Sequence, residues 1–565
     1  MYTRVDTTDK AKPGGTYNSV LATDVVTLDP LSAATFNTLD IVAAFTYPKM
    51  LQFSLSKYPK LSKGEVEGQL AESYELSADH LTLTFKVRPG MRWDSRAPTN
   101  GREIDSSDVV FSWNKYAQVS PLRGDFVYSS SNPSAPVESV SAPDSRTVVF
   151  KLHHPDASIV QLFATSVLFY NMPKESDGGF DPKGTVRGYG PYVLEDYRPS
   201  TQFLWAKSPN YYVKNRPFMD KISLPIVPEY ATRLSQFKAG NVWTPVHRQE
   251  DILPTKKDLP VLNLLQGADF PKTPWFLSFG YEGNSPFKDE RMRQAVSLIF
   301  DKETIIDITS NRPAFESQGL PIPVRYMATI GPGWEGYWID PQDEKKFGAN
   351  SKYYKYDVPE AKKLMAAAGY TGSEVALYYN QGQQYGTQYL QVGEALAGMF
   401  NDGGLKTKSD PREYQNDWLP NFYYGYAAGN KGFTGVKWMA ERTYPTVASQ
   451  LFATLHKDGP RFVGMTPTGN NAQQGDPKVN ADVEKIRNEF DLEKQQALVH
   501  DLLRYMAGKA YYIPVQFPVG TPGFSLYWPC VSNLGAYVGF AGSNTAAETG
   551  LHLWIDTTKP PLGPG

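Results

Sequence analysis

The chain has 565 residues, of which 41% are hydrophobic and 21% are charged, and its net charge is −2. This length exceeds what one hydrophobic core organises, so we expect about two to four lobes. The near-neutral charge argues against a nucleic-acid binder, which needs a concentrated basic face, and no run reaches the ~20 apolar residues that span a bilayer. Cys530 is the only cysteine, which excludes an internal disulfide, a CxxC redox pair and a cysteine-based zinc site.

The first half of the chain is dominated by strand patterns. In LTLTFKVRPGMRW the residues Leu83, Phe85 and Val87 alternate with polar residues before a Pro-Gly turn, as expected of a half-buried strand. Further strands are expected at RTVVFKLH, GPYVLEDY and TQFLWAK. Helices are expected at IDSSDVVFSWNKYA, with Asp105 or Ser106 as the N-cap, and at YATRLSQFKAGNVW, which ends at Gly240.

Helical patterns are clearer in the second half. In FKDERMRQAVSLIF the apolar residues fall on one helical face, and in YDVPEAKKLMAAAGY residue Asp357 is the expected N-cap, with Gly369 closing the helix. DLEKQQALVHDLLRYMAGKA predicts a helix with Gly508 at its end, and YYIPVQFPV then predicts a strand. The chain is therefore α/β, without internal repeats.

The sequence carries no signature of an enzyme. GxxxxGK[ST], HExxH and GxSxG motifs do not occur. His153 and His154 are adjacent on an expected strand, where side chains point to opposite faces, so the pair does not chelate one metal readily. Asp105 and Asp108 are better explained by a helix cap than by paired catalytic carboxylates. We therefore expect no catalytic residue, no metal site, no cofactor and no enzymatic activity.

Five stretches, taken in order, resemble one protein family. They are LAESYELSADHLTLTFKVRPGMRWDS, IDSSDVVFSW, RGYGPYVLEDYRPSTQFLWAKSPNYY, SPFKDERMRQAVSLIFDKETI and YDVPEAKKLMAAAGY. Together they resemble the family 5 extracellular solute-binding proteins, which are the oligopeptide, dipeptide and nickel-type receptors of ABC importers. Tyr189 replaces the threonine that is usual in the family's GTGPY turn. The resemblance covers about Leu28 to Pro518 and is specific only when the five stretches are taken jointly.

The resemblance implies a two-lobed periplasmic-binding-protein fold of type II, similar to cluster C, with an extra domain inserted in the N-terminal lobe. The implied division is a discontinuous domain I of residues 1–47, 184–268 and 510–565, an inserted domain II of residues 48–183, and a domain III of residues 269–509. The ligand is expected in the cleft between domains I and III, which close over it by a hinge motion.

The segment WMAERTYP matches a W--D---P pattern of the family at Trp438, Ala440, Glu441 and Pro445. In peptide-binding members the acidic position of this pattern pairs with the ligand's α-ammonium. The acid in this chain is Glu441 rather than aspartate, so a primary amine would bind in a different pose. The alternative is that Glu441 turns toward Arg442 and leaves an uncharged ligand to be held by other groups.

The resemblance also suggests residues that line the ligand site by their position. The candidates are Trp438, Met439 and Glu441 in the matched segment, Trp275 and Phe276 at the entry to domain III, Thr35 and Phe36 after an LDP loop, and Tyr379 and Asn380 at the end of an expected strand. Each of these residues has a second interpretation as a core residue.

The leading hypothesis is a receptor for peptides or related amine-bearing solutes, with a small-molecule or peptide ligand and an ABC transporter permease as partners. Because 13% of the residues are aromatic, the alternative is a receptor that holds oligosaccharides or another neutral solute by aromatic stacking. A secreted glycan-processing enzyme and a receptor for chelated nickel are minor hypotheses. We expect a monomer that does not bind nucleic acid.

The N-terminal residues MYTRVDTTDKAKPGG contain no apolar segment, so the sequence shows no signal peptide. The resemblance nevertheless implies an extracytoplasmic protein of bacteria, either periplasmic or lipid-anchored at the cell surface.

Overall fold

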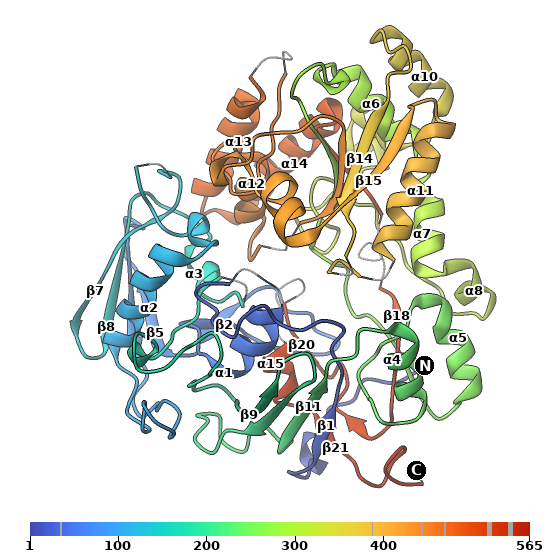
Figure 1. The fold of residues 1–565 in the computed structure, drawn as a ribbon. Helices are drawn as coiled ribbons and strands as arrows, with labels where there is room; N and C mark the ends of the chain where they lie inside the picture. The colour runs from blue at the N-terminus through green and yellow to red at the C-terminus, as the bar shows by residue number, and fades with distance from the viewer. Residues whose placement is uncertain are drawn as a thin grey trace. The chain divides into compact units, whose positions relative to one another are not determined.

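The computed structural model describes residues 1–33, 35, 37–130, 132–166, 168–382, 384–386, 388–441, 444–467, 471–516, 522–540 and 546–564. The chain forms two compact units: Met1–Ala268 with Phe524–Gly565 make the first, and Asp269–Gly523 make the second. The chain therefore passes between the units twice (Figure 1).

The second crossing differs from the boundary that we expected at 509/510. Strand β17 (Tyr512–Pro514) pairs with β13 (Trp275–Phe279) of the second unit, so residues 510–523 belong to that unit and not to the first. The pairing of β17 with β13 decides this boundary. A local sequence pattern does not reveal such pairing between distant strands. The division into three domains, with residues 48–183 as an inserted domain, stays a prediction.

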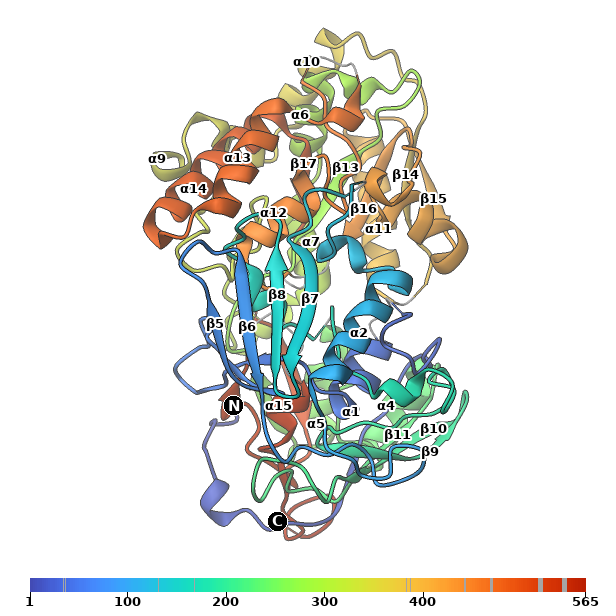
Figure 2. The same ribbon diagram turned by 90° about the vertical axis from the view of Figure 1, so that its left-hand side faces the viewer.

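Among its described residues, the first unit contains two four-stranded sheets. One has the order β1 (Thr16–Asn18), β11 (Lys221–Pro225), β10 (Gln202–Lys207) and β9 (Tyr192–Arg198). The other has the order β5 (Ala71–Leu76), β6 (Thr82–Val87), β8 (Thr147–Leu152) and β7 (Val137–Asp144). The second sheet is antiparallel throughout, and its strands lie side by side in Figure 2, with helix α2 (Ser106–Val119) next to β7.

Shorter elements complete the first unit. Four two-stranded sheets lie among its described residues. Strand β2 (Leu51–Phe53) pairs with β4 (Val66–Gly68), and β3 (Ser56–Lys57) pairs with β20 (Tyr537–Val538). Strand β19 (Val531–Ser532) pairs with β21 (Trp554–Ile555), and β12 (Asn263–Gln266) pairs with β18 (Phe524–Tyr527). The remaining α-helices are α1 (Ala44–Thr46), α3 (Ile159–Leu162), α4 (Tyr230–Lys238), α5 (Gln249–Asp258) and α15 (Ala546–Gly550). A π-helix, Thr38–Ala43, precedes α1.

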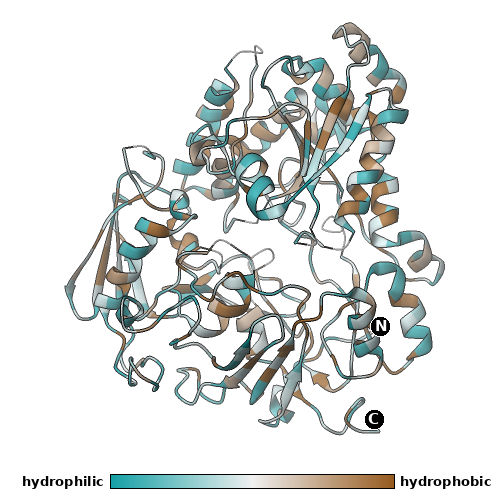
Figure 3. Cartoon of the chain, in the orientation of Figure 1, coloured by the Kyte–Doolittle hydropathy of each residue, from teal (hydrophilic) through white to brown (hydrophobic). Residues whose placement is uncertain are grey.

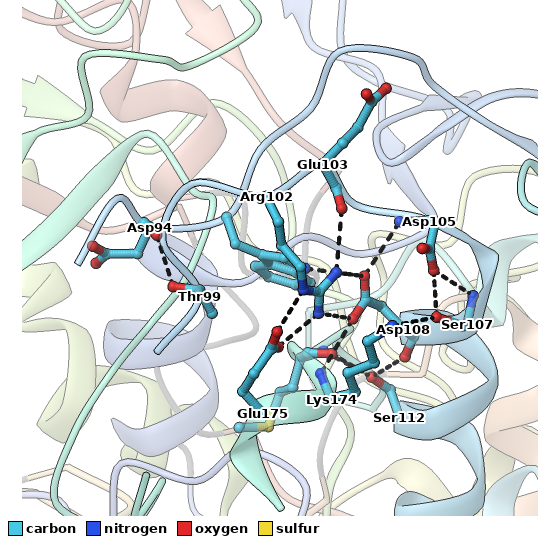
Figure 4. A network of polar contacts seen from close by, with 12 residues as sticks. Asp94, Thr99, Arg102, Glu103, Asp105, Ser107, Asp108, Ser112, Lys174 and Glu175 are labelled. Atoms are coloured by element: carbon cyan, nitrogen blue, oxygen red, sulfur yellow. Dashed lines mark hydrogen bonds and ion pairs between the residues drawn. The ribbon is translucent and has the colours of Figure 1, made fainter. Parts of the chain in front are cut away.

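A network of charged groups anchors the start of α2 in the first unit, and we call it the Arg102 network (Figure 4). The guanidinium of Arg102 donates to both oxygens of Asp108, at 2.8 and 2.5 Å, and to both oxygens of Glu175, at 2.5 and 2.6 Å. Asp108 is fully buried, and it also accepts the indole N–H of Trp93 at 3.0 Å and the backbone N–H of Lys174 at 3.1 Å. The network ties the distant residues Lys174 and Glu175 to the start of α2, which Arg102 and Trp93 also contact.

The second unit is built on one five-stranded sheet. Its order is β15 (Thr407–Arg412), β14 (Val375–Asn380), β16 (Val436–Ala440), β13 and β17. Strand β14 is parallel to both β15 and β16, while β13 is antiparallel to β16 and to β17. The central strands β13 and β16 are buried along their whole length, as expected of strands that are covered on both faces.

The second unit also contains helices, of which α11 (Tyr389–Asp402) packs on strands β14 and β15. The other described α-helices are α6 (Glu290–Ile299), α7 (Lys302–Ser310), α8 (Arg312–Ser317), α9 (Glu344–Phe347), α10 (Val358–Ala367), α12 (Val447–Leu455), α13 (Pro477–Asn488) and α14 (Leu492–Lys509). Helix α11 lies along β14 and β15 in Figure 1 and carries hydrophobic residues beside hydrophilic ones in Figure 3. A π-helix, Tyr414–Tyr423, follows β15.

Several local predictions are confirmed. Asp105 is the N-cap of α2 and forms a capping box with Asp108, Asp357 caps α10, and Gly240 adopts a positive φ just after α4. The expected end of the last long helix at Gly508 is wrong, because α14 continues to Lys509 and ends on Ala510 in the left-handed region. A Cβ at Gly508 would lie 2.6 Å from the side-chain nitrogen of Asn350, so a larger residue here would displace that side chain.

Candidate functional site

One edge of the second unit's sheet collects the ends of several strands. The strands β14, β15 and β16 run in one direction, and β17 shares it because both β16 and β17 are antiparallel to β13. Their carboxyl ends therefore meet at the edge where β13 begins with Trp275. Ligands of open α/β sheets bind outside the carboxyl ends of the strands, so this edge is the candidate site.

Hydrogen bonds continue the pairing beyond the strand ends. The backbone N–H of Glu441 donates to the carbonyl of Pro274 at 3.0 Å, and that of Val515 donates to the carbonyl of Trp275 at 2.9 Å. The register of β13 with β17 pairs Phe276 with Pro514, so Gln516 is the residue opposite Pro274. Glu441, which follows β16, and Gln516, which follows β17, thus lie opposite the same residue, Pro274, on its two sides.

Glu441 lies beside a buried arginine. Its Oε1 is 3.5 Å from the Nε of Arg461, and only 1% and 2% of the two side chains are exposed. The guanidinium of Arg461 lies 4.5 Å from the ring centre of Tyr423 and 5.2 Å from that of Tyr424. Arg461 is therefore a partner of Glu441 that the sequence did not suggest, while Arg442, the partner considered there, lies outside the described residues.

A buried lysine on the same strand completes a charged group that we call the Glu441 cluster, formed by Lys437, Glu441 and Arg461. The ammonium of Lys437 donates to the backbone carbonyl of Phe422 at 2.6 Å. Burial lowers the pKa of Lys437 from 10.5 to about 7, although the charge of Glu441 opposes this shift. The cluster contains one acid and two bases, so the protein itself offsets the negative charge of Glu441.

The two candidate tryptophans belong to an aromatic group on the other face of the sheet. Trp438 is fully buried, its ring stacks on Tyr389 of α11 at 5.2 Å, and it lies 5.4 Å from Trp275. The Tyr389 hydroxyl donates to the Trp438 carbonyl at 2.5 Å. Alternation along β16 places Lys437, Met439 and Glu441 on the opposite face. The part of these tryptophans in ligand binding stays a prediction.

Four further candidates belong to the second unit. Met439 and Phe276 are buried, and Phe276 packs edge-on against Tyr512 at 4.8 Å. Tyr379 and Asn380 are also buried at the end of β14, and Asn380 orders the following loop by accepting the N–H of Gly382 at 2.9 Å. All these residues belong to the second unit.

Thr35 belongs to the first unit and contacts Thr38 through their hydroxyls at 3.0 Å. Phe36 lies outside the described residues. Lys437, Arg461 and Gln516 are residues at the site that the sequence reasoning passed over. Lys437 in VKWMA and Gln516 in YYIPVQFPV could have been noticed as polar residues within otherwise apolar stretches, whereas Arg461 gives no comparable local signal.

Reactive groups elsewhere have ordinary structural roles. In the described ranges, no three or more His, Cys, Asp or Glu side chains are grouped so that they could hold a metal ion. His153 stacks on Tyr128 at 3.8 Å, and His154 contacts two backbone carbonyls. Burial raises the pKa of the Cys530 thiol to about 12. The helices among the described residues are too short or too polar to cross a membrane.

Two curated proteins show the sequence relationship. The chain is 28% identical over 352 residues to heme-binding protein A of Haemophilus influenzae and 25% identical over 353 residues to the dipeptide-binding protein of Escherichia coli. These alignments span 58% and 59% of this chain but only 59% of the length of each relative.

The fold is shared with a solved structure. The periplasmic binding protein DppA of Helicobacter pylori, in complex with the peptide STSA, superimposes with a TM-score of 0.75 at 17% identity, covering 97% of this chain and 99% of that one. This likeness confirms the predicted periplasmic-binding-protein fold, while the extra inserted domain stays a prediction.

The sequence model of the bacterial extracellular solute-binding proteins, family 5 Middle, matches residues 65–459. These residues include β14, β16 and Glu441 of the candidate site. The family comprises binding proteins and not enzymes. The chain therefore belongs to the family 5 bacterial extracellular solute-binding proteins.

Proposed function

We propose that the protein is the extracytoplasmic substrate-binding receptor of an ABC importer and that its ligand carries a primary ammonium group, as peptides do. The observation that carries this proposal is the buried carboxylate of Glu441 at the carboxyl edge of the second unit's sheet. The names of the relatives support it, since one is a dipeptide-binding protein and one solved structure holds a peptide.

The contact with Arg461 is compatible with this role. A carboxylate offers about four acceptor sites, so Glu441 can contact both Arg461 and a ligand ammonium. The N–O distance of 3.5 Å to Arg461 is longer than the ~2.7–2.9 Å of a strong charge-assisted hydrogen bond. We infer that Arg461 holds the carboxylate in place and lowers the charge that the ligand has to compensate.

The alternative ligand, a neutral sugar or similar solute, depends on aromatic faces that can stack on it. The rings of Trp438, Trp275 and Tyr389 instead pack against one another. The amine-bearing ligand is therefore the better supported proposal. Closure of the units over the ligand, a lipid anchor and a monomeric state are predictions that accompany it.

The test combines a protein variant with a ligand variant. Native mass spectrometry of the protein with a pool of Ala-X-Ala tripeptides identifies a retained peptide, which is then synthesised with a free and with an acetylated N-terminus. Calorimetry measures both forms against the wild type and Glu441→Gln. If the ammonium binds Glu441, either change alone weakens binding about 10- to 100-fold, that is by about 1.4–2.7 kcal/mol.

The two changes together should cost little more than one alone, because groups in contact are not additive. Glu290→Gln is the control, since Glu290 pairs with Lys509 and not with the candidate site. An affinity within twofold of the wild type for Glu441→Gln would contradict the ammonium contact. Failure of every tripeptide to bind would contradict the peptide class as a whole.

A further inference from the structure

The side chain of Gln516 is buried without a hydrogen-bond partner. It is 1% exposed, and neither its amide oxygen nor its amide nitrogen has a partner among the described residues. An unpaired buried polar group costs on the order of 1–3 kcal/mol, and such groups are rare in native proteins. The packing of the described residues therefore leaves both polar atoms of this amide unpaired.

A second buried glutamine shows that the same unit can satisfy such a side chain. Gln450 in α12 is also 1% exposed, but its oxygen accepts the backbone N–H of Tyr444 at 3.0 Å and its nitrogen donates to the Thr454 hydroxyl at 3.3 Å. The two residues differ in position. Gln450 lies within a helix, whereas Gln516 follows the carboxyl end of β17.

Strand register places Gln516 on the same face of the sheet as Glu441. Ser278 of β13 is paired with Lys437 on one side and with Tyr512 on the other, and residues opposite one another share a face. Alternation then carries this face from Lys437 to Glu441 and from Tyr512 to Gln516. Both residues flank Pro274, two strand spacings apart, which is about 10 Å between Cα atoms.

We propose that Gln516 is a ligand-binding residue whose carboxamide hydrogen-bonds a peptide group of the ligand that Glu441 holds by its ammonium. The proposal rests on the proposed function and names a second contact in the same site. A carboxamide both donates and accepts, and so does a peptide group, so the two are complementary. An extended peptide advances about 3.3 Å per residue, so Gln516 meets the second or third residue of the ligand and not the first.

The test uses two variants of the full chain, Gln516→Leu and its matched control Gln450→Leu. Thermal unfolding is recorded without peptide, and calorimetry then measures the retained Ala-X-Ala tripeptide and the dipeptide that lacks its last residue. Without peptide, Gln516→Leu should unfold at the same or a higher temperature, because it removes an unpaired buried amide. Gln450→Leu should unfold at a lower temperature, because it removes paired groups.

With peptide, Gln516→Leu should bind the tripeptide at least about 10-fold more weakly, which is about 1.4 kcal/mol, with a smaller loss for the dipeptide. Tripeptide affinity within twofold of the wild type would overturn the proposal, and so would a fall in unfolding temperature as large as that of Gln450→Leu. If the wild type binds no tripeptide, the proposed function fails and this inference fails with it. If the wild type binds and Gln516→Leu binds equally well, only the inference fails.

Discussion

The two units each bury a group of charged side chains, and the two groups are balanced in different ways. In the Arg102 network one base meets two acids, and in the Glu441 cluster one acid lies among two bases. The excess negative charge of the first is offset by donors from the protein, including the N–H groups near the start of α2. A helix N-terminus favours negative charge in this way.

The titration of the two groups reflects this difference. The hydrogen bonds from Arg102 lower the pKa of Glu175, so the acid is held in its charged form. In the Glu441 cluster burial lowers the pKa of Lys437 to about 7, so the excess base loses its proton near neutral pH. In the Arg102 network the arginine makes short bidentate pairs with two carboxylates. In the Glu441 cluster the Nε of Arg461 lies 3.5 Å from the Oε1 of Glu441, at the sheet edge that we propose binds the ligand. We infer that the first group stabilises the fold and that the second serves binding.

The largest expected effect tests the first half of this contrast. Arg102→Met should lower the free energy of unfolding by about 3 kcal/mol, because it leaves the fully buried Asp108 without its charged partner. Urea denaturation measures the loss. Arg198→Met is the control, because Arg198 and its partner Asp196 are 60% and 43% exposed, and such pairs contribute no more than about 1 kcal/mol. Equal losses for the two variants would contradict a structural role for the network.

A pH-dependent effect on stability tests the charge state of the Glu441 cluster. Because the pKa of Lys437 falls from 10.5 to about 7 on folding, the unfolded chain binds more protons over this window, and stability rises with pH across it. Lys437→Met removes this dependence. Its stability relative to the wild type should be greatest below about pH 7 and decline by on the order of 1–3 kcal/mol toward about pH 9, as measured by urea denaturation at several pH values.

Lys302→Met is the matched control for that prediction. Lys302 is also buried, burial lowers its pKa to about 7, and it donates to the Ser297 carbonyl at 3.0 Å. Its variant should show the same pH trend in stability. A difference between Lys437→Met and the wild type that does not change with pH would contradict the proposed charge state of the Glu441 cluster.

The smallest expected effect separates the helix cap from the Arg102 network around it. Asp105→Ala should cost about 1 kcal/mol, the usual value for loss of an N-cap, because the Asp105 side chain accepts the N–H of Ser107. Asp357→Ala, at the start of α10 in the second unit, should cost a similar amount. If Asp105→Ala lowers the free energy of unfolding as much as Arg102→Met does, the buried ion pair is not the main stabilising contact of the Arg102 network.

The sequence was sufficient for features that depend on near neighbours. The caps at Asp105 and Asp357 follow from side chains that reach N–H groups two or three residues away. The alternation of Leu83, Phe85 and Val87 matches their burial in β6. The family resemblance also belongs here, because its motifs are read along the chain, and the family assignment is confirmed by the match over residues 65–459.

Only the tertiary structure decided features that join distant residues. Glu441 meets Arg461, which follows helix α12. Gln516 is aligned with Glu441 through Pro274, and β17 joins the second unit by pairing with β13. The segment WMAERTYP indicated that Glu441 matters, but it did not show that two buried bases offset its charge or that Trp438 faces the opposite side of the sheet. The pattern of neighbouring residues determines whether a residue lies in a helix or a strand and which face of that element carries its side chain. The partners of the side chain depend on the packing of segments that are far apart in the sequence.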